Sequence, residues 1–165
     1  MPFQTTPAGT PVQTRTNGFS ALPARFDAVA AYTVLRAALG FAMFMHGIAR
    51  FVGGIDIYAH RYIAGFAGVA LPHSLVVLFI YAIPYFEVII GAPIVLGLLT
   101  RWALLANAAL LLVFIFGTSM QQGWGGVETQ LVYTLIVSLL LLGLGLNVVS
   151  LDNLFRRRGG RLSSR

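Results

Sequence analysis

The sequence contains no cysteine and no lysine, and it is poor in charge. Only 10% of its 165 residues are charged, whereas an ordinary soluble domain has about 25%. Without cysteine, this chain forms no disulfide, thiolate metal site, iron–sulfur ligation or covalent c-type haem attachment. Because so few charged groups cannot cover the surface of a water-soluble domain, the composition excludes a soluble enzyme domain.

The sequence is instead rich in long apolar runs, and 58% of its residues are hydrophobic. Four stretches stand out, at residues 28–52, 74–98, 101–120 and 128–149. Each is close to the roughly 20 residues that a helix needs to cross a bilayer. The sequence therefore predicts an all-α, membrane-embedded four-helix bundle over residues 27–152. A flexible tail rich in Thr, Pro and Gly is expected at residues 1–26, and a basic tail at 153–165.

The positions of the arginines predict how the bundle is oriented. All 11 basic residues are arginines, against five acidic residues, which gives a net charge of +6. Eight of them fall on one side of the predicted spans: Arg15, Arg25, Arg101, Arg156, Arg157, Arg158, Arg161 and Arg165. Because positive charge gathers in cytoplasmic loops, both termini are expected in the cytoplasm of a bacterial-type inner membrane. Because the positions of the arginines are explained by this orientation, no nucleic-acid partner is expected.

The first outer loop, residues 53–73, is long and has a helical pattern. Its apolar positions are Ile55, Tyr58, Tyr62 and Phe66, and its polar positions are Asp56, His60 and Arg61. This spacing predicts a short interfacial helix with one apolar face. We favour an aromatic anchor at the membrane surface, and the alternative is a lid over a substrate.

Two ionisable residues lie well inside the predicted spans, Arg36 in the first and Glu87 in the second. Each would cost about 2.5 to 3.5 kcal/mol alone in hydrocarbon. Counted from the predicted span ends, both lie at a similar depth in antiparallel helices, so we expect an ion pair between them. Pro84 lies one turn before Glu87 and is expected to kink the second helix beside the acid, because proline lacks the N–H for the helical hydrogen bond.

The first span carries a second set of polar residues near its outer end. One helix face contains Arg36, Gly40, Met43, Gly47 and Arg50, and His46 borders it. The two glycines allow another helix to approach closely. Arg50 and His46 are candidates to bind a small anion or a quinone carbonyl. The alternative is that Arg50 reaches to the membrane interface and that His46 bonds a neighbouring helix.

Glu128 begins the fourth predicted span at the outer surface. An acidic residue is favourable at the positive N-terminal end of a helix, and this explains its position without a binding role. Glu128 is kept as a weaker candidate for the binding site.

Four ordered blocks of residues resemble the DoxX-like family of membrane proteins. The first is the Arg, Gly, His-Gly and basic pattern of Arg36, Gly40, His46, Gly47 and Arg50. The second runs from Pro84 and Glu87 through Gly91 to Gly97, Thr100 and Arg101. The third and fourth are Gly126 with Glu128, and Gly143 and Gly145 with Ser150 and Asp152. The resemblance covers residues 32–152, although family members commonly have lysine where this chain has Arg50.

The resemblance implies a four-helix membrane subunit similar to the DoxD and DoxX subunits of thiosulfate:quinone oxidoreductase. Thiosulfate would then give electrons to quinone, with Glu87 and His46 handling protons and Arg36, Arg50 and Glu128 binding the substrate or quinone. Quinone is the expected electron acceptor, and no metal or flavin site is evident in this chain. Arginine keeps the positive charge of the family lysine but does not support lysine-type proton or Schiff-base chemistry.

Two alternative functions remain open from the sequence. The chain is either a non-catalytic membrane anchor for a partner redox subunit or, with less support, a small-anion transporter that uses charges at the middle of the membrane. Small residues on the helix faces also allow a homo-oligomer. The lipid bilayer is a partner of the chain in each of these hypotheses.

Overall fold

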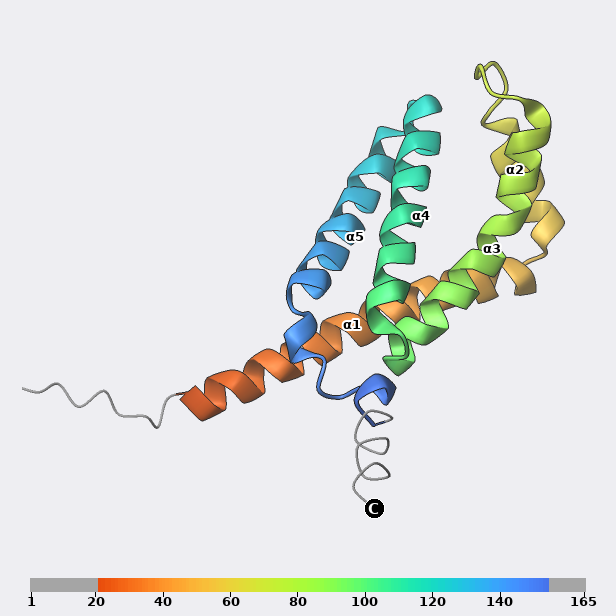
Figure 1. Ribbon diagram of the computed structural model, residues 1–165. Coiled ribbons are helices and arrows are strands. Elements are labelled where there is room, and N and C mark those ends of the chain that lie inside the picture. The colour runs from red at the N-terminus through yellow and green to blue at the C-terminus, as the bar shows by residue number, and fades with distance from the viewer. Residues whose placement is uncertain (1–20, 155–165) are drawn as a thin grey trace, which may run out of the picture.

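The computed structural model describes residues 21–154, and this part of the chain is helical, with no strand. Its elements are α1 (Ala21–Val52), α2 (Ile55–Ala64), α3 (His73–Leu96), α4 (Thr100–Met120), α5 (Trp124–Leu142) and the 3₁₀ turn η1 (Leu144–Leu146). Four of them, α1, α3, α4 and α5, are long and apolar enough to cross a membrane (Figure 1). The predicted all-α membrane fold is confirmed, and α2 is the short helix predicted between the first two spans.

Three predicted boundaries differ most from the observed ones, and one of them is the start of the last span, which lies at Trp124 and not at residue 128. α1 begins at Ala21, inside the segment 1–26 that was predicted to be a tail. The last span ends at Leu142 and not at residue 149, because the backbone leaves the α-helical path at Gly143 and forms η1. Residues 151–154 add a further helical turn. The rest of both predicted tails lies outside the described residues.

α1 and α3 form the most extensive helix pair of the bundle. Three glycines make this close approach possible: Gly40 and Gly47 on α1, and Gly91 on α3. A β-carbon at Gly91 would lie 2.5 Å from the backbone nitrogen of Phe44. One at Gly47 would lie 2.7 Å from the carbonyl oxygen of Pro84. The predicted close approach at the two α1 glycines is therefore confirmed, and it fixes which residues of α3 lie opposite α1.

α3 contains Pro84 and Pro93 within its helical span. Each proline removes one backbone donor, so the helix changes direction, as Figure 1 shows for α3. The half of α3 that follows α2 stands apart from α4 and α5, whereas its last turns approach them (Figure 1). The bend therefore separates a loosely packed end of the bundle from a tightly packed one.

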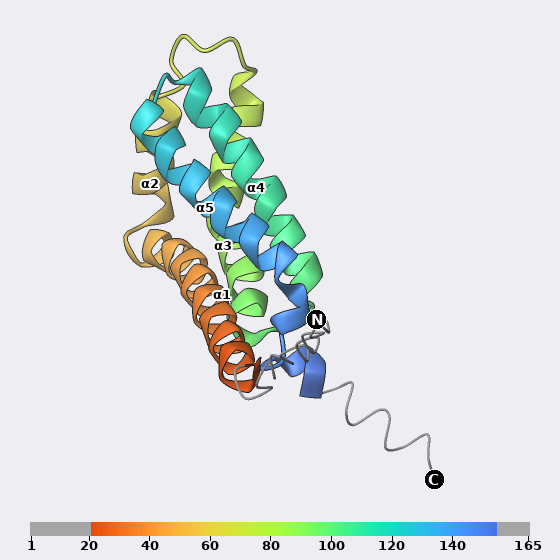
Figure 2. The ribbon, with the colours of Figure 1, turned by 90° about the vertical axis from the view of Figure 1, so that its left-hand side faces the viewer.

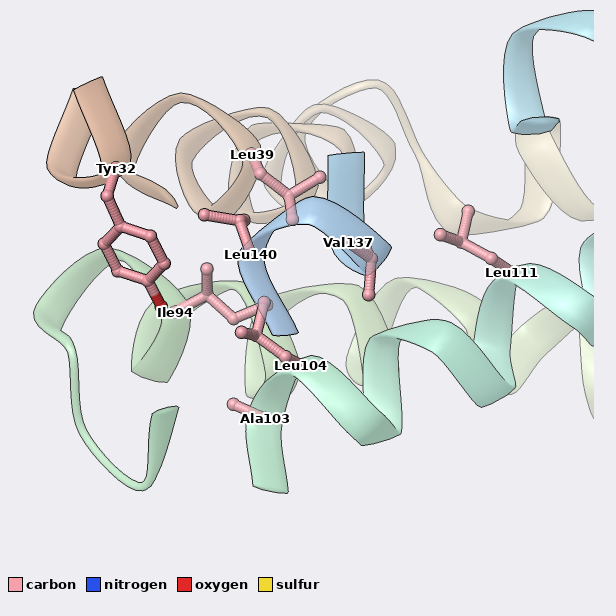
Figure 3. Close-up of a cluster of buried hydrophobic side chains, with 8 residues drawn as sticks. All are labelled: Tyr32, Leu39, Ile94, Ala103, Leu104, Leu111, Val137 and Leu140. Carbon is pink, nitrogen blue, oxygen red and sulfur yellow. The ribbon is translucent and has the colours of Figure 1, made fainter. Parts of the chain in front are cut away.

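The tightly packed end is where α1 begins and α5 ends, and we call it the chain-terminal end; the opposite end, which carries α2, is called the α2 end. Figure 2 shows the first turns of α1 and the segment after α5 on the same side. The core near this end combines side chains of all four spans (Figure 3): Tyr32, Leu39, Ile94, Ala103, Leu104, Leu111, Val137 and Leu140. Large apolar side chains such as Val34, Leu78 and Leu135 point outward instead, as suits contact with lipid.

A polar cap closes the turn between α3 and α4 at the chain-terminal end. Gly97 takes a left-handed conformation with φ of 66°, which ends α3. The Asp152 carboxylate then accepts hydrogen bonds from the backbone N–H groups of Leu99 (2.6 Å) and Thr100 (2.8 Å) and from the Thr100 hydroxyl (2.9 Å). A residue beyond α5 thus caps the N-terminus of α4 and fastens the end of the described chain to the bundle.

Candidate functional site

Glu87 forms an ion pair with Arg50, not with Arg36. The Glu87 side chain is only 3% exposed and that of Arg50 is 19% exposed. The pair lies between α1 and α3 on the α2 side of Gly91. The predicted pair of Arg36 and Glu87 is therefore wrong, although the expectation that Glu87 is buried and paired with an arginine of the first span is correct.

The Arg36 guanidinium binds backbone carbonyls at the chain-terminal end. It donates to the carbonyl oxygens of Ile94 (2.5 Å), Val95 (3.0 Å) and Val149 (2.9 Å). The carbonyls of the last turn of a helix have no partner within that helix, and a cation there is favourable. Arg36 therefore caps the end of α3 and ties it to the segment after α5.

The register of α1 against α3 explains the error. Gly40 packs against Val95, and Gly47 packs against Pro84 and Val88. In this register Arg36 lies beside the end of α3, while Glu87 lies directly opposite Arg50. The predicted depth of Arg36 takes residue 28 as the beginning of the first helix, whereas α1 begins at Ala21. The contacts of the glycines, not the distance from the span ends, set the pairing.

Tyr58 of α2 covers Arg50, and Tyr62 lies beside Tyr58. The guanidinium carbon of Arg50 lies 4.6 Å from the centre of the Tyr58 ring, in a cation–π arrangement. The Tyr58 and Tyr62 ring centres are 4.6 Å apart. Burial raises the pKa of Tyr58 to about 12, although nearby Arg50 acts to lower it. The Tyr58 hydroxyl therefore stays protonated at neutral pH and is available as a hydrogen-bond donor.

An apolar cavity of about 330 Å³ lies at the α2 end, beside Arg50. Its walls come mainly from α3 and α4, and α2 with the following loop contributes Tyr58, Tyr62 and Phe66. The loop side is closed where Phe66 approaches Gly117 and where Gln121 lies against Gly65. The apolar face predicted for the loop helix thus faces this cavity. Tyr58 and Tyr62 line a binding space, in addition to any anchoring role at the interface.

The lining of the apolar cavity is uneven in polarity. Aliphatic and aromatic side chains make up most of it, including Ile80, Ile83 and Phe114. Polar groups come from Arg50 and the tyrosines and also from Thr118 of α4, Gln121 of the turn after α4 and Gln130 of α5. Gln130 donates to the Thr118 hydroxyl (2.9 Å), and its own side-chain oxygen is buried without a partner among the described residues. An elongated molecule with an apolar body and polar substituents fits such a lining.

A second hollow, of about 350 Å³, lies on the other side of Arg50, and we call it the basic depression. It is lined by the side chains of His46, Arg50 and Arg61, by Tyr58 and Tyr62, and by the α1–α2 linker. Arg50, Tyr58 and Tyr62 line both the apolar cavity and the basic depression. These three residues therefore separate an apolar binding space from a basic one.

The structure brings together three of the five predicted site residues. His46 and Arg50 share the basic depression, and Glu87 pairs with Arg50. Arg36 lies at the opposite end. Glu128 is exposed in the second turn of α5, not at its beginning, and it lines neither hollow. Its interpretation as an acidic residue of the first turn is wrong, because α5 begins at Trp124.

Sequence reasoning missed Arg61 and the two tyrosines as site residues. Tyr58 and Tyr62 are four residues apart, on the apolar face of the predicted loop helix. This pattern predicts that they lie at an interface, but it does not identify the residues that they contact. The position of Tyr58 over Arg50 depends on the tight linker at Gly53 and Gly54, after which α2 packs against the first half of α3. Among residues 21–154, no group of three or more His, Asp or Glu side chains is arranged to hold a metal ion.

Comparison of the sequence with models of protein families finds a match to the DoxX family over residues 31–120. This segment is more than half of the chain and runs from α1 through α4. It includes Arg50, Glu87 and α2, whereas α5 lies beyond it. Comparisons with curated proteins and with solved structures find no match.

Proposed function

We propose that this chain, which belongs to the DoxX family of membrane proteins, is the quinone-binding membrane subunit of a redox system that oxidises a sulfur compound such as thiosulfate. The observation that carries the proposal is the apolar cavity of about 330 Å³ with Arg50 and two tyrosines at its polar end. Quinones combine an apolar tail with a ring whose carbonyl oxygens need hydrogen-bond donors. This cavity offers both kinds of surface within a membrane-spanning bundle.

The size and position of the apolar cavity suit a quinone ring. Ligand pockets are typically about 300 to 1,000 Å³, so this one is large enough for a ring but not for a long isoprenoid tail. Several of its lining side chains, including Leu75, Val113 and Phe116, are also exposed on the lipid-facing surface. A tail therefore has a path from the cavity into the bilayer between α3 and α4.

The polar residues have distinct roles in this proposal. Arg50 supplies a permanent positive charge that polarises a carbonyl oxygen, and Tyr58 supplies a neutral donor. A bound quinone supplies the capacity to accept two electrons and two protons. Glu87 compensates the charge of Arg50 and holds its guanidinium in place, so we assign it a positioning role. His46 is exposed and lines the basic depression, and we assign it the proton-transfer role in this proposal.

A photoreactive short-tail quinone tests the binding step. Illumination of the purified protein in nanodiscs, followed by peptide mass spectrometry, is expected to label residues that line the apolar cavity. Val113→Trp fills the cavity mouth and should reduce labelling at least tenfold. The matched control is Leu112→Trp, because Leu112 is the adjacent residue of α4, is 62% exposed and does not line the cavity. Equal labelling of the two variants would contradict the proposal.

The redox role needs a separate measurement. Membranes that contain the chain together with its native partners should reduce quinone when thiosulfate is added, and Arg50→Met should remove this activity. If Arg50→Met abolishes quinone labelling but leaves thiosulfate-dependent reduction intact, the chain is an anchor and another subunit carries the reaction. Thiosulfate accumulation in vesicles without quinone reduction would indicate transport instead.

A further inference from the structure

The apolar cavity has polar groups at two levels of the bundle. Arg50 lies at its inner level, because the partner of Arg50, Glu87, is near the middle of α3. Thr118 lies in the last turn of α4 and Gln130 lies two turns into α5, so both are close to the α2 end. Arg50, Thr118 and Gln130 all line the cavity. The cavity therefore offers polar contacts to two separate parts of one ligand.

The cavity wall between these two levels is apolar. Ile83 lies one turn from Glu87 toward the α2 end, and Phe114 lies one turn from Thr118 toward the chain-terminal end. Both side chains line the cavity. A ring that packs against Ile83 and Phe114 directs substituents on its opposite sides toward the two polar levels. The two oxygens of a quinone are on opposite sides of its ring.

Thr118 and Gln130 have unused hydrogen-bonding capacity. The Gln130 Nε2 donates to the Thr118 Oγ1 at 2.9 Å, and the Gln130 side-chain oxygen is buried without a partner within residues 21–154. The Thr118 hydroxyl accepts this bond, and no group in the described part of the chain accepts its own hydrogen. The pair therefore has one free donor and one free acceptor. A buried acceptor without a donor is unfavourable, and the terminal torsion of glutamine is broad enough to turn the amide toward a ligand.

We propose that Thr118 and Gln130 bind the second ring oxygen and select the reduced, hydroquinone form of the ligand, an inference that rests on the proposed quinone site. A quinone carbonyl only accepts hydrogen bonds, so it uses the Thr118 donor and leaves the Gln130 oxygen unpaired. A hydroquinone hydroxyl both accepts and donates, so it satisfies both groups. Arg50 donates at the inner level to either form. By linkage, tighter binding of the reduced form makes reduction of the bound ring more favourable.

Isothermal titration calorimetry of the full chain in nanodiscs, under nitrogen, tests the proposal. A short-tail benzoquinone and the corresponding hydroquinone are titrated separately, and titration into empty nanodiscs corrects for partitioning of each form into lipid. The parent chain should bind the hydroquinone about fivefold more tightly than the quinone, which corresponds to one neutral hydrogen bond. Gln130→Met keeps the unbranched shape of glutamine but removes the acceptor. It should weaken the hydroquinone about fivefold and change the quinone affinity less than about twofold.

The matched control is Thr129→Val, because Thr129 is the adjacent residue of α5, is exposed and does not line the cavity. It should leave both affinities unchanged. Melting temperatures show whether each variant is folded, and Gln130→Leu repeats the test if Gln130→Met is unstable.

Two further outcomes separate this inference from the proposed function. If Val113→Trp leaves the binding of both forms unchanged, the ligand is not in the cavity and the quinone site itself is wrong. If Val113→Trp blocks both forms but the parent binds them equally, or Gln130→Met weakens them equally, only the selection of the reduced form is overturned.

Discussion

Arg36 and Arg50 are on the same helix, yet they serve the two ends of the bundle in different ways. Arg36 is 3% exposed and donates to backbone carbonyls of Ile94, Val95 and Val149. Arg50 pairs with Glu87, stacks on Tyr58 and lines two hollows. One arginine therefore satisfies backbone carbonyls at the chain-terminal end, and the other lines two hollows at the α2 end.

This difference shows how to separate structural from functional charges in a membrane protein. The terminal nitrogens of Arg36 donate to backbone carbonyls at helix ends, and Arg36 lines neither hollow, so its contacts are those of a structural charge. Arg50 lines two hollows, so a ligand in either hollow can contact its guanidinium. We therefore place the binding function at the α2 end, and the chain-terminal end supplies rigidity.

The largest expected effect comes from breaking the pair at the α2 end. Arg50→Met leaves the buried Glu87 carboxylate without its partner and should lower the free energy of unfolding by about 3 to 5 kcal/mol. The midpoint of unfolding in mild detergent with added denaturant measures this loss. The double variant Arg50→Met with Glu87→Leu should recover most of it, because no charge is then left unpaired.

If the double variant is as unstable as Arg50→Met alone, the ion pair is not the cause of the loss. The double variant also sharpens the functional comparison. It should keep the bundle folded while it loses quinone labelling, since Arg50 is the one charged donor that lines the cavity within residues 21–154. Labelling at the parent level in the folded double variant would remove Arg50 from the site.

The next effect is at the chain-terminal end. Arg36→Met removes three hydrogen bonds from a charged donor and should lower the free energy of unfolding by about 2 to 3 kcal/mol. The midpoint of unfolding measures the loss. In contrast to Arg50→Met, quinone labelling of the remaining folded protein should be unchanged, because Arg36 lines neither hollow. Reduced labelling of the folded fraction would show that the two ends are not independent.

The fold was largely predictable from the sequence, because four apolar runs of sufficient length allow few alternatives in a membrane. The loop helix was predictable for a similar reason, since Tyr58 and Tyr62 lie on one face of a clear helical pattern. The end of the last span was not. Gly143 and the residues after it are apolar enough to continue a helix, and their departure into η1 follows from tertiary contacts of Asn147 and Asp152 with Thr100.

The close contact between α1 and α3 at Gly91 sets the register of these two helices. A β-carbon at Gly91 would meet backbone atoms of Phe44, which cannot move aside as a flexible side chain does. Gly91→Ala should therefore lower the free energy of unfolding by about 1 to 3 kcal/mol, although alanine is the better helix former. Thermal melting of the purified protein checks this expectation.

Gly125→Ala is the control for Gly91→Ala. Gly125 also lies within a helix, and nothing is within 4 Å of the position that its β-carbon would take. This variant should be neutral or slightly stabilising. Equal melting temperatures for the two variants would contradict the role assigned to the contact between α1 and α3.

The candidate site was only partly predictable, and the reason is the helix register. Sequence alone indicated that Arg36, Arg50 and Glu87 lie on facing helices, but it did not give the axial offset between those helices. An offset of a few residues decides which arginine meets Glu87. Gly40, Gly47 and Gly91 set this offset, because each allows a close contact with one position of the other helix. The sequence does not show which position each glycine contacts.

The smallest effect concerns the cap of α4 and depends on pH. Partial burial acts to raise the pKa of Asp152, but hydrogen bonds from the backbone of Thr100 and Leu99 and from the Thr100 hydroxyl outweigh it, so the pKa is lowered. Because the folded state binds the proton less readily than the unfolded state, this stabilisation is present above the ordinary carboxyl pKa and is lost as the pH falls through the lowered value. Asp152→Ala should cost about 1 kcal/mol at pH 7. In melting experiments from pH 7 down to pH 3, the difference between the parent and Asp152→Ala should shrink, and a difference that stays constant would mean that the charge of Asp152 does not stabilise the chain-terminal end.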